Sequence, residues 1–114
     1  MTTKDPNVYL AHARDCAARV LAYTQGGKGS LADPKTQDAV LRNLEVIGQC
    51  FKDANLELLE DRHPDVPWRD IAAFRNVLAH AYLGINLGIV WEIVDRQLPA
   101  LLSSLNRILD HWAP

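Results

Sequence analysis

The sequence has few cysteines, and it has no apolar run that approaches the length of a membrane-spanning helix. Cys16 and Cys50 form no CxxC motif and have no histidines at zinc-site spacing, so we expect two reduced thiols in the core. The N-terminal residues MTTKDPNVYL lack the apolar segment of a secretory signal. Together these absences predict a soluble, cytoplasmic protein without a membrane partner.

The sequence also lacks an excess of positive charge. The formal net charge is −2 at pH 7, whereas dedicated nucleic-acid binders are usually basic, so any contact with RNA must come from a local patch. The glycine-rich segment 26–30 lacks the GxxxxGKS/T spacing of a phosphate loop and a preceding strand, which predicts a flexible turn. The acidic residues between positions 53 and 65 are scattered, so we expect a solvated surface, no metal site and no cofactor.

What the sequence does contain is apolar periodicity of the helical kind. At 114 residues, 48% of them hydrophobic, we expect a single domain over 1–114. The Asp-Pro pairs at 5–6 and 33–34 are typical of helix starts, with the carboxylate as N-cap and proline at the first helical position. The first helix is predicted to reach about Tyr23, and the second carries apolar residues at helical spacing from Val40 to Phe51.

Gly48 lies within the apolar stripe of that second helix and indicates close approach of another helix, since an exposed glycine there would only weaken it. Residues 55–60 either continue this helix or form a short one of their own. The segment 61–67 contains two prolines and is predicted to be a loop. Trp68 then begins the next helix.

The last helix is predicted to start at Asn86 and to be kinked at Pro99, which removes one backbone donor and crowds the preceding turn. No segment shows the alternation of a strand. We therefore predict an all-α bundle of four or five helices with a kinked C-terminal helix. Three tryptophans and a leucine-rich C-terminal stretch are much apolar surface for this size, which favours a homodimer.

Residues 74–82 read Phe-Arg-Asn-Val-Leu-Ala-His-Ala-Tyr and carry the groups that metal-free phosphoryl chemistry requires. Arg75 offers planar, bidentate donors to a phosphate, and His80 titrates near neutrality and can act as base or acid. On a straight helix, residues five apart are separated by about 140°, so one regular helix does not direct both at one phosphate. Either the helix loosens between them, or the site is assembled between two copies. Residue types alone also allow a surface arginine and a helix-ending histidine.

The spacing Arg75-x4-His80-x-Tyr82 resembles the RX4HXY motif of HepT toxins, in the HEPN superfamily of small helical ribonucleases. The segments LRNLEVIG at 41–48, WRDI at 68–71, and GINL and VW between 84 and 91 are also similar to this family. The resemblance covers about residues 33 to 102. Ala81 stands where the family often has a polar residue, and Asn86 where it often has aspartate, which could alter contacts with substrate or partner.

The resemblance implies a homodimeric, metal-independent endoribonuclease that is the toxin of a type VII-like toxin–antitoxin pair. Arg75 would be the phosphate clamp and His80 the general acid/base, in a cleft at the dimer interface. The family's partner, an MntA-type minimal nucleotidyltransferase, would neutralise the toxin by transferring AMP to Tyr82. The chain lacks the nucleotidyltransferase signature, a Gly-Ser followed by Asp-x-Asp, so it would be the target of that transfer.

Four more residues are candidates for lining the cleft. Asn76 shares a helix face with His80. Arg42 and Asn43 either line the cleft or form a solvated stripe. Arg69 either extends a phosphate track or, as we expect, forms a salt bridge at the rim.

Two other functions remain open at the level of sequence. The chain is either a non-catalytic helical partner that binds a nucleotidyltransferase, which the negative net charge favours, or a structural dimerisation module whose motif is silent.

Overall fold

The computed structural model describes residues 5–81 and 86–113, with side chains throughout these ranges except at positions 77 and 79–81. Within these ranges the structure contains helices and no strand, which confirms the predicted all-α class. In chain order the elements are α1 (Pro6–Tyr23), the 3-10 turn η1 (Lys28–Ala32), α2 (Pro34–Ala54), α3 (Leu56–Arg62), α4 (Trp68–Ala81), α5 (Leu87–Glu92), the π-helical turn η2 (Ile93–Gln97) and α6 (Leu98–Leu109).

Both long N-terminal helices begin at the predicted Asp-Pro pairs. The Asp5 carboxylate accepts a hydrogen bond from the backbone N–H of Asn7 at 2.9 Å, and the Asp33 carboxylate accepts one from Thr36 at 3.0 Å. Each bond satisfies a donor that a helix start leaves without an intrahelical partner. Asp5 also accepts from the Trp112 indole N–H at 3.0 Å, so the start of α1 lies beside the end of α6.

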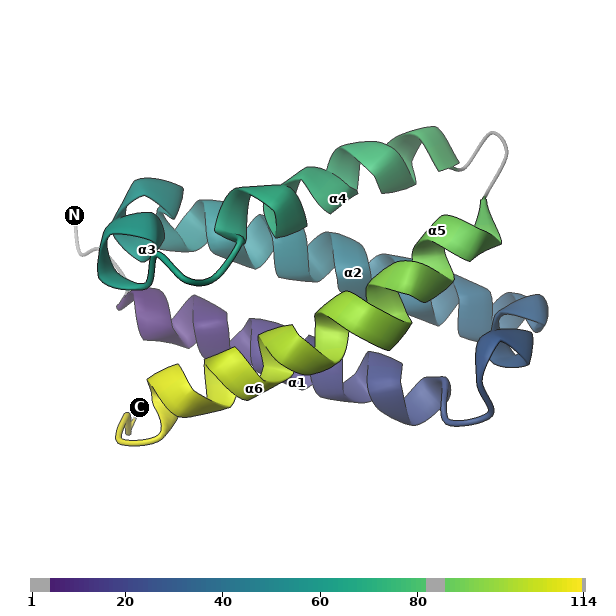
Figure 1. Cartoon of the computed structure of the whole chain (residues 1–114), viewed down its shortest axis with the longest axis horizontal. Coiled ribbons are helices and arrows are strands. Elements are labelled where there is room, and N and C mark those ends of the chain that lie inside the picture. Colours follow the sequence, from purple (N-terminus) through teal and green to yellow (C-terminus); the bar gives the residue numbers. More distant parts are fainter. Residues whose placement is uncertain (1–4, 82–85, 114) are drawn as a thin grey trace.

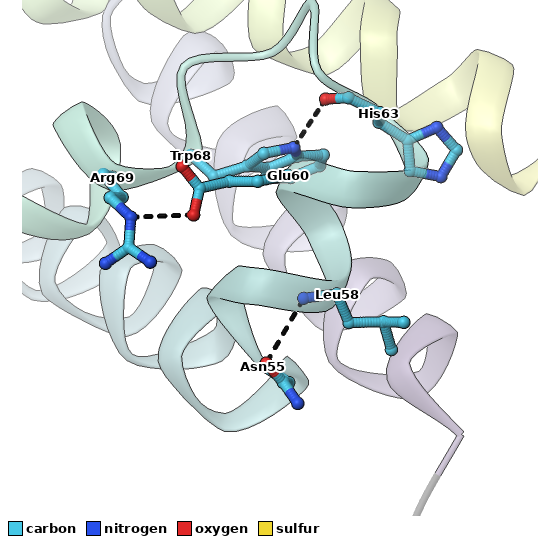
Figure 2. Close-up of polar contacts among 6 residues, drawn as sticks. All are labelled: Asn55, Leu58, Glu60, His63, Trp68 and Arg69. Atoms are coloured by element: carbon cyan, nitrogen blue, oxygen red, sulfur yellow. Dashed lines mark hydrogen bonds and ion pairs between the residues drawn. The ribbon is translucent and has the colours of Figure 1, made fainter.

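A sharp corner joins α2 to α3 and α4 (Figure 2). Asn55 has a φ of 86° and separates α2 from α3, which is therefore a helix of its own. The Asn55 side chain caps α3 by accepting a hydrogen bond from the backbone N–H of Leu58 at 3.3 Å. The predicted loop at 61–67 is shorter than expected, because α3 continues through Arg62. The Trp68 indole donates to the carbonyl of His63 at 2.9 Å and fixes the return into α4.

The core is formed around α2, which packs against α1 on one side and α4 on the other, while α6 packs on α1 (Figure 1). Phe51 of α2 is fully buried and meets the Trp68 ring edge-on, with 4.9 Å between ring centroids. Such a pair adds about 0.5–1.5 kcal/mol to the stabilisation from area burial. The Trp68 contact holds the first turn of α4 against α2, and α4 carries the candidate site.

The C-terminal helix accommodates Pro99 through a local change of winding. Asn86 caps the helix by accepting from the N–H groups of Gly88 at 3.0 Å and Ile89 at 3.3 Å, as its sequence predicts. The irregularity expected at Pro99 takes the form of the π-helical turn η2, and the proline stands in the first turn of α6. A wider turn relieves the clash between the proline ring and the preceding turn and absorbs the missing donor.

All three tryptophans contact the chain's own core. Trp68 is buried, and Trp91 and Trp112 are partly buried against the same cluster of apolar side chains. Part of the surface of Trp91 and Trp112 remains exposed, and the homodimer stays a prediction. Among the helices of the described residues, none has the length and apolarity that crossing a membrane requires.

Candidate functional site

The close approach predicted at Gly48 is confirmed and places α2 directly beside α4. A Cβ atom built on Gly48 would lie 3.2 Å from the carbonyl oxygen of Ala72 and 3.6 Å from its Cα. A Cβ at this distance would be tighter than most real contacts, so the absence of a side chain favours the close approach of the two backbones. Gln49, the next residue of α2, can therefore reach Arg75, which is one turn beyond Ala72 on α4.

Arg75 is held at the surface of α4 by a short chain of hydrogen bonds. Its guanidinium Nη1 donates to Oε1 of Gln49, and Nε2 of Gln49 donates to Oδ1 of Asp53 at 2.9 Å. The Gln49 amide thus accepts a hydrogen bond through its oxygen and donates one through its nitrogen, which favours a single orientation of the amide. Because Arg75 is bound to a neutral amide, it keeps its full positive charge and has further N–H donors available.

The Arg75 side chain stands at the edge of a cleft over the outer face of α2, between α1 and α4. The cleft has a volume of about 340 Å³. Its lining consists of Tyr9 and His12 from α1, Arg42, Glu45, Val46, Gln49, Cys50 and Asp53 from α2, and Arg75 from α4. The α2 residues recur at intervals of three and four, so they form one face of the helix.

The charged groups in the cleft are not paired with one another. Arg42 and Glu45 are three residues apart on α2, a spacing that often gives an ion pair. Among the described residues neither forms a hydrogen bond or a salt bridge, even though both line the cleft. Both are therefore accessible to a bound molecule.

The lining of the cleft contains a thiol of low reactivity. Cys50 is 5% exposed, and burial raises the pKa of its thiol to about 11, with smaller contributions from Cys16 and Asp53. At neutral pH the sulfur is protonated and is a poor nucleophile. Burial likewise raises the pKa of Cys16. Both cysteines are free and buried, as predicted.

The geometry of α4 bears on how Arg75 and His80 can cooperate. The helix is continuous from Trp68 to Ala81, so it does not loosen between these two residues. Five positions of regular helix separate their Cα–Cβ directions by about 140°. The side chain of His80 and the whole of Tyr82 lie outside the described residues. Asn76 is exposed on α4 and does not belong to the lining of the cleft.

The other residues predicted for a cleft between two chains differ in whether they also line this cleft of the single chain. Arg42 lines the cleft together with Arg75. Asn43 does not: its amide donates to the carbonyl of Ala39 at 2.8 Å and accepts from Arg19 at 3.4 Å. Arg69 forms the expected salt bridge, with 2.7 Å between its Nε and Oε1 of Glu60 (Figure 2).

Comparison with known families connects this geometry to a class of proteins. The model of the family described as ribonuclease HepT-like matches residues 13–108, which is most of the chain and includes α2, α4 and the cleft residues on these two helices. The chain belongs to the ribonuclease HepT-like family. This HepT-like chain matches no solved structure significantly.

Several curated proteins are similar to the HepT-like chain. A "Putative RNase" of Caldanaerobacter subterraneus subsp. tengcongensis is 33% identical over 108 residues, which cover 93% of this chain and 96% of the relative. A "Probable ribonuclease HepT" of Thermococcus cleftensis is 37% identical over 78 residues, covering 68% and 70%. A protein of Methanocaldococcus jannaschii named "Gamma-glutamylcyclotransferase and putative RNase" is 30% identical over 94% of this chain, which spans only 49% of that relative.

Sequence reasoning about the HepT-like chain missed part of the cleft. Gln49, Tyr9 and His12 carry no assigned role in the sequence, whereas Asp53 is exposed, as expected for the acidic residues between positions 53 and 65. One signal was available, because Arg42, Glu45, Gln49 and Asp53 recur at helical spacing beside the apolar stripe of α2. That they meet residues of α1 and α4 depends on how the helices pack. Within the described part of the chain, no group of three His, Cys, Asp or Glu side chains is placed to hold a metal ion.

Proposed function

We propose that this HepT-like protein is a metal-independent endoribonuclease, with Arg75 as the phosphate clamp and His80 as the general acid/base. Three observations support the proposal: the family, the names of the relatives, and the position of Arg75 at the edge of a cleft. The Gln49 amide orients the Arg75 guanidinium without neutralising it. Such an oriented cation would stabilise the charge that grows on the phosphorus oxygens during cleavage.

The observation that carries the proposal furthest is the unbroken course of α4. Because the helix separates Arg75 and His80 by about 140°, one chain alone does not aim both groups at one phosphate. A two-fold dimer solves this problem, since a cleft shared by two chains receives both residues twice. We therefore place the reaction in a cleft between two copies of the chain.

The reaction itself needs one base and one acid. The base takes the proton of the ribose 2′-hydroxyl, whose oxygen attacks the phosphorus, and the acid protonates the leaving 5′-oxygen as the P–O bond breaks. One histidine per chain supplies half of this pair, whereas a dimer supplies two. The products would be a 2′,3′-cyclic phosphate and a free 5′-hydroxyl.

The test is cleavage of single-stranded RNA by purified protein in EDTA. Wild-type protein should cut and leave cyclic phosphate or 3′-phosphate ends, whereas His80→Ala and Arg75→Ala should lose about 100-fold or more of the rate. Arg75→Lys keeps the charge but not the bidentate fork, so it should retain only part of the activity. Arg69→Ala removes an arginine that is paired with Glu60 and is the matched control for loss of charge. Undiminished cutting by His80→Ala would remove His80 from the mechanism.

A dimeric site also makes activity depend on association. Sedimentation equilibrium should give a dimer at the concentrations at which RNA is cut, and specific activity should fall on dilution below the dimer dissociation constant. A protein that remains monomeric and fully active would contradict the shared cleft.

We further propose that the protein is a toxin controlled by an MntA-type nucleotidyltransferase at Tyr82. The phenol oxygen of Tyr82 would attack the α-phosphorus of ATP, forming an ester with AMP and releasing pyrophosphate. The added phosphate would repel an RNA backbone. Mass spectrometry of the chain co-expressed with a neighbouring nucleotidyltransferase should show AMP on Tyr82, and Tyr82→Phe should abolish the mass shift. Label on Tyr9 or Tyr23 instead would reassign the acceptor.

A second candidate function is non-catalytic binding of a nucleotidyltransferase, and the net charge of −2 favours it, since it gives RNA no general attraction. Expression of the chain alone separates the two. Growth arrest that His80→Ala relieves supports the toxin, whereas normal growth together with tight binding of the nucleotidyltransferase supports the binding partner.

A further inference from the structure

The cleft beside Arg75 has a lining that is chemically more varied than a phosphate clamp requires. Two arginines, Arg42 and Arg75, stand in it with the aromatic rings of Tyr9 and His12. Hydrogen-bond acceptors are present as well, and the floor is apolar at Val46 and Cys50. A protein binds a nucleotide through a cation for the phosphate, an aromatic ring that stacks on the base, and hydrogen-bond acceptors for the base edge. The cleft contains all three kinds of group.

Two charged side chains of the cleft, Arg42 and Glu45, are available to bind a ligand. Gln49 donates to Asp53 and accepts from Arg75, so hydrogen bonds link these three side chains along one wall of the cleft. Arg42 and Glu45 make no hydrogen bond or ion pair within the described residues, which leaves one donor group and one acceptor group accessible in the cleft. A plain anion would gain from Arg42 but would be repelled by Glu45. A ligand that carries both a phosphate and hydrogen-bond donors satisfies both residues.

The size of the cleft suits a ligand of one nucleotide. Its volume of about 340 Å³ lies at the small end of the range of about 300–1,000 Å³ found for ligand pockets. One nucleotide fills such a space, whereas a folded partner or a base-paired helix does not enter it. Bases of single-stranded RNA are recognised by stacking on aromatic side chains together with hydrogen bonds to their edges.

We propose that this cleft is a subsite for the single-stranded RNA nucleotide next to the phosphate that is cleaved. The proposal rests on the proposed function and adds a recognition site to it. The base stacks on the Tyr9 ring, and Arg42 binds the phosphate on the far side of that nucleotide. Arg75, at the edge of the same cleft, holds the phosphate that reacts.

The subsite also predicts a base preference through Glu45. A carboxylate accepts hydrogen bonds and donates none, so it favours bases whose edges present amino groups. Cytosine, adenine and guanine carry an exocyclic amine, whereas uracil has none and presents a carbonyl oxygen where cytosine has its amine. The subsite therefore prefers cytosine or adenine to uracil, and this preference depends on Glu45.

Binding of mononucleotides tests the subsite without requiring cleavage. Full-length ¹⁵N-labelled protein is titrated with CMP, AMP and UMP, and chemical-shift changes are followed at residues of α1 and α2. CMP or AMP should bind about tenfold more tightly than UMP, with shifts centred on the cleft. Tyr9→Ala should weaken CMP binding by about tenfold, and Tyr9→Phe, which keeps the ring, should weaken it less. Tyr23→Ala, an exposed tyrosine at the other end of α1, is the matched control.

Cleavage kinetics test the same assignment in the substrate. With RNAs that differ only in the base beside the cut, Tyr9→Ala should raise KM by about tenfold and affect kcat less. Glu45→Gln should reduce the preference for cytosine or adenine over uracil, whereas Glu57→Gln on α3 should keep it. Circular dichroism of each variant checks that the helices are intact, because Tyr9 also packs against the core.

The outcomes separate the subsite from the ribonuclease activity. If wild-type protein cuts RNA but Tyr9→Ala and Glu45→Gln keep the wild-type KM and base preference, the subsite is wrong and the ribonuclease stands. If wild-type protein does not cut RNA, the proposed function fails, and mononucleotide shifts in the cleft then decide whether a nucleotide site exists. Shifts confined to residues away from Tyr9 and Arg42 overturn the assignment. Equal binding of all three mononucleotides overturns the role of Glu45.

Discussion

Replacing Gly48 with alanine should destabilise this protein, although the same change stabilises most helices. At an exposed helical position, alanine is favoured over glycine by about 1 kcal/mol. At Gly48 the added Cβ would lie 3.2 Å from the carbonyl oxygen of Ala72 and 3.6 Å from that of Ile71. Both neighbours are backbone atoms of α4, so no flexible side chain can turn away. The backbone of α4 must instead shift by a few tenths of an ångström.

The size of the effect follows from two opposing terms. Overpacking of a tight contact costs about 1–3 kcal/mol, and the gain in helix propensity returns about 1 kcal/mol. The net loss is about 1 kcal/mol in the free energy of unfolding, or about 4 °C in Tm for a chain of this size. Gly29→Ala is the control, because a Cβ there meets nothing within 4 Å. It should leave stability unchanged or raise it by up to about 1 kcal/mol.

Urea unfolding followed by circular dichroism and tryptophan fluorescence measures both variants. Because the α2–α4 contact also sets the reach of Gln49 to Arg75, Gly48→Ala should lower RNA cleavage as well as stability. A Gly48→Ala protein that is as stable as Gly29→Ala would show that α4 yields freely at Ala72. In that case the close approach would not be what positions Gln49.

Further predictions concern the residues around the cleft. Gln49→Leu removes the acceptor that orients Arg75 and should lower single-turnover RNA cleavage by about tenfold. Gln49→Glu keeps an acceptor and should mainly raise KM at low salt, because the carboxylate partly neutralises Arg75. Equal kcat and KM in the wild type and both variants would contradict this role of Gln49. The Cys50 thiol should react slowly with a disulfide reagent at pH 8 in folded protein and quickly in urea, since burial raises its pKa from 9.0 to about 11. Its contribution to stability is fully present below pH 9 and is lost as the pH rises towards about 11, so Cys50→Ala should flatten the alkaline side of the stability profile; an unchanged slope between pH 9 and 11 would refute the assignment.

Local chemistry explains which parts of the fold could be predicted from the sequence. Asp5, Asp33 and Asn86 cap helices through bonds that span two or three residues, so their roles follow from the residue type and its neighbours. Gly48 was also predictable, because a glycine inside an apolar stripe has few reasons other than close packing. The all-α class needed only the helical periodicity.

Other features of the fold could not be predicted, because the residue types allowed more than one local structure. The irregularity expected at Pro99 could have been a kink or a wider turn, and the structure has the π-helical turn η2. At Asn55 the chain adopts a positive φ, which asparagine tolerates better than most residues, but the sequence also allowed an uninterrupted helix. The cleft could not be predicted from the sequence, because its walls come from α1, α2 and α4 and the way these helices pair depends on how the bundle packs.

The negative net charge is compatible with binding to RNA once the charges are counted where a ligand would meet them. A net charge of −2 gives weak repulsion over long distances, and salt screens it within about 10 Å. Inside the cleft, Arg42 and Arg75 face Glu45 and Asp53, so the described lining carries two cations and two carboxylates and no net negative charge. A two-fold dimer doubles these charges and leaves them balanced. Binding of RNA would therefore depend on short-range contacts more than on electrostatic steering, which suits recognition of a single nucleotide at a defined site.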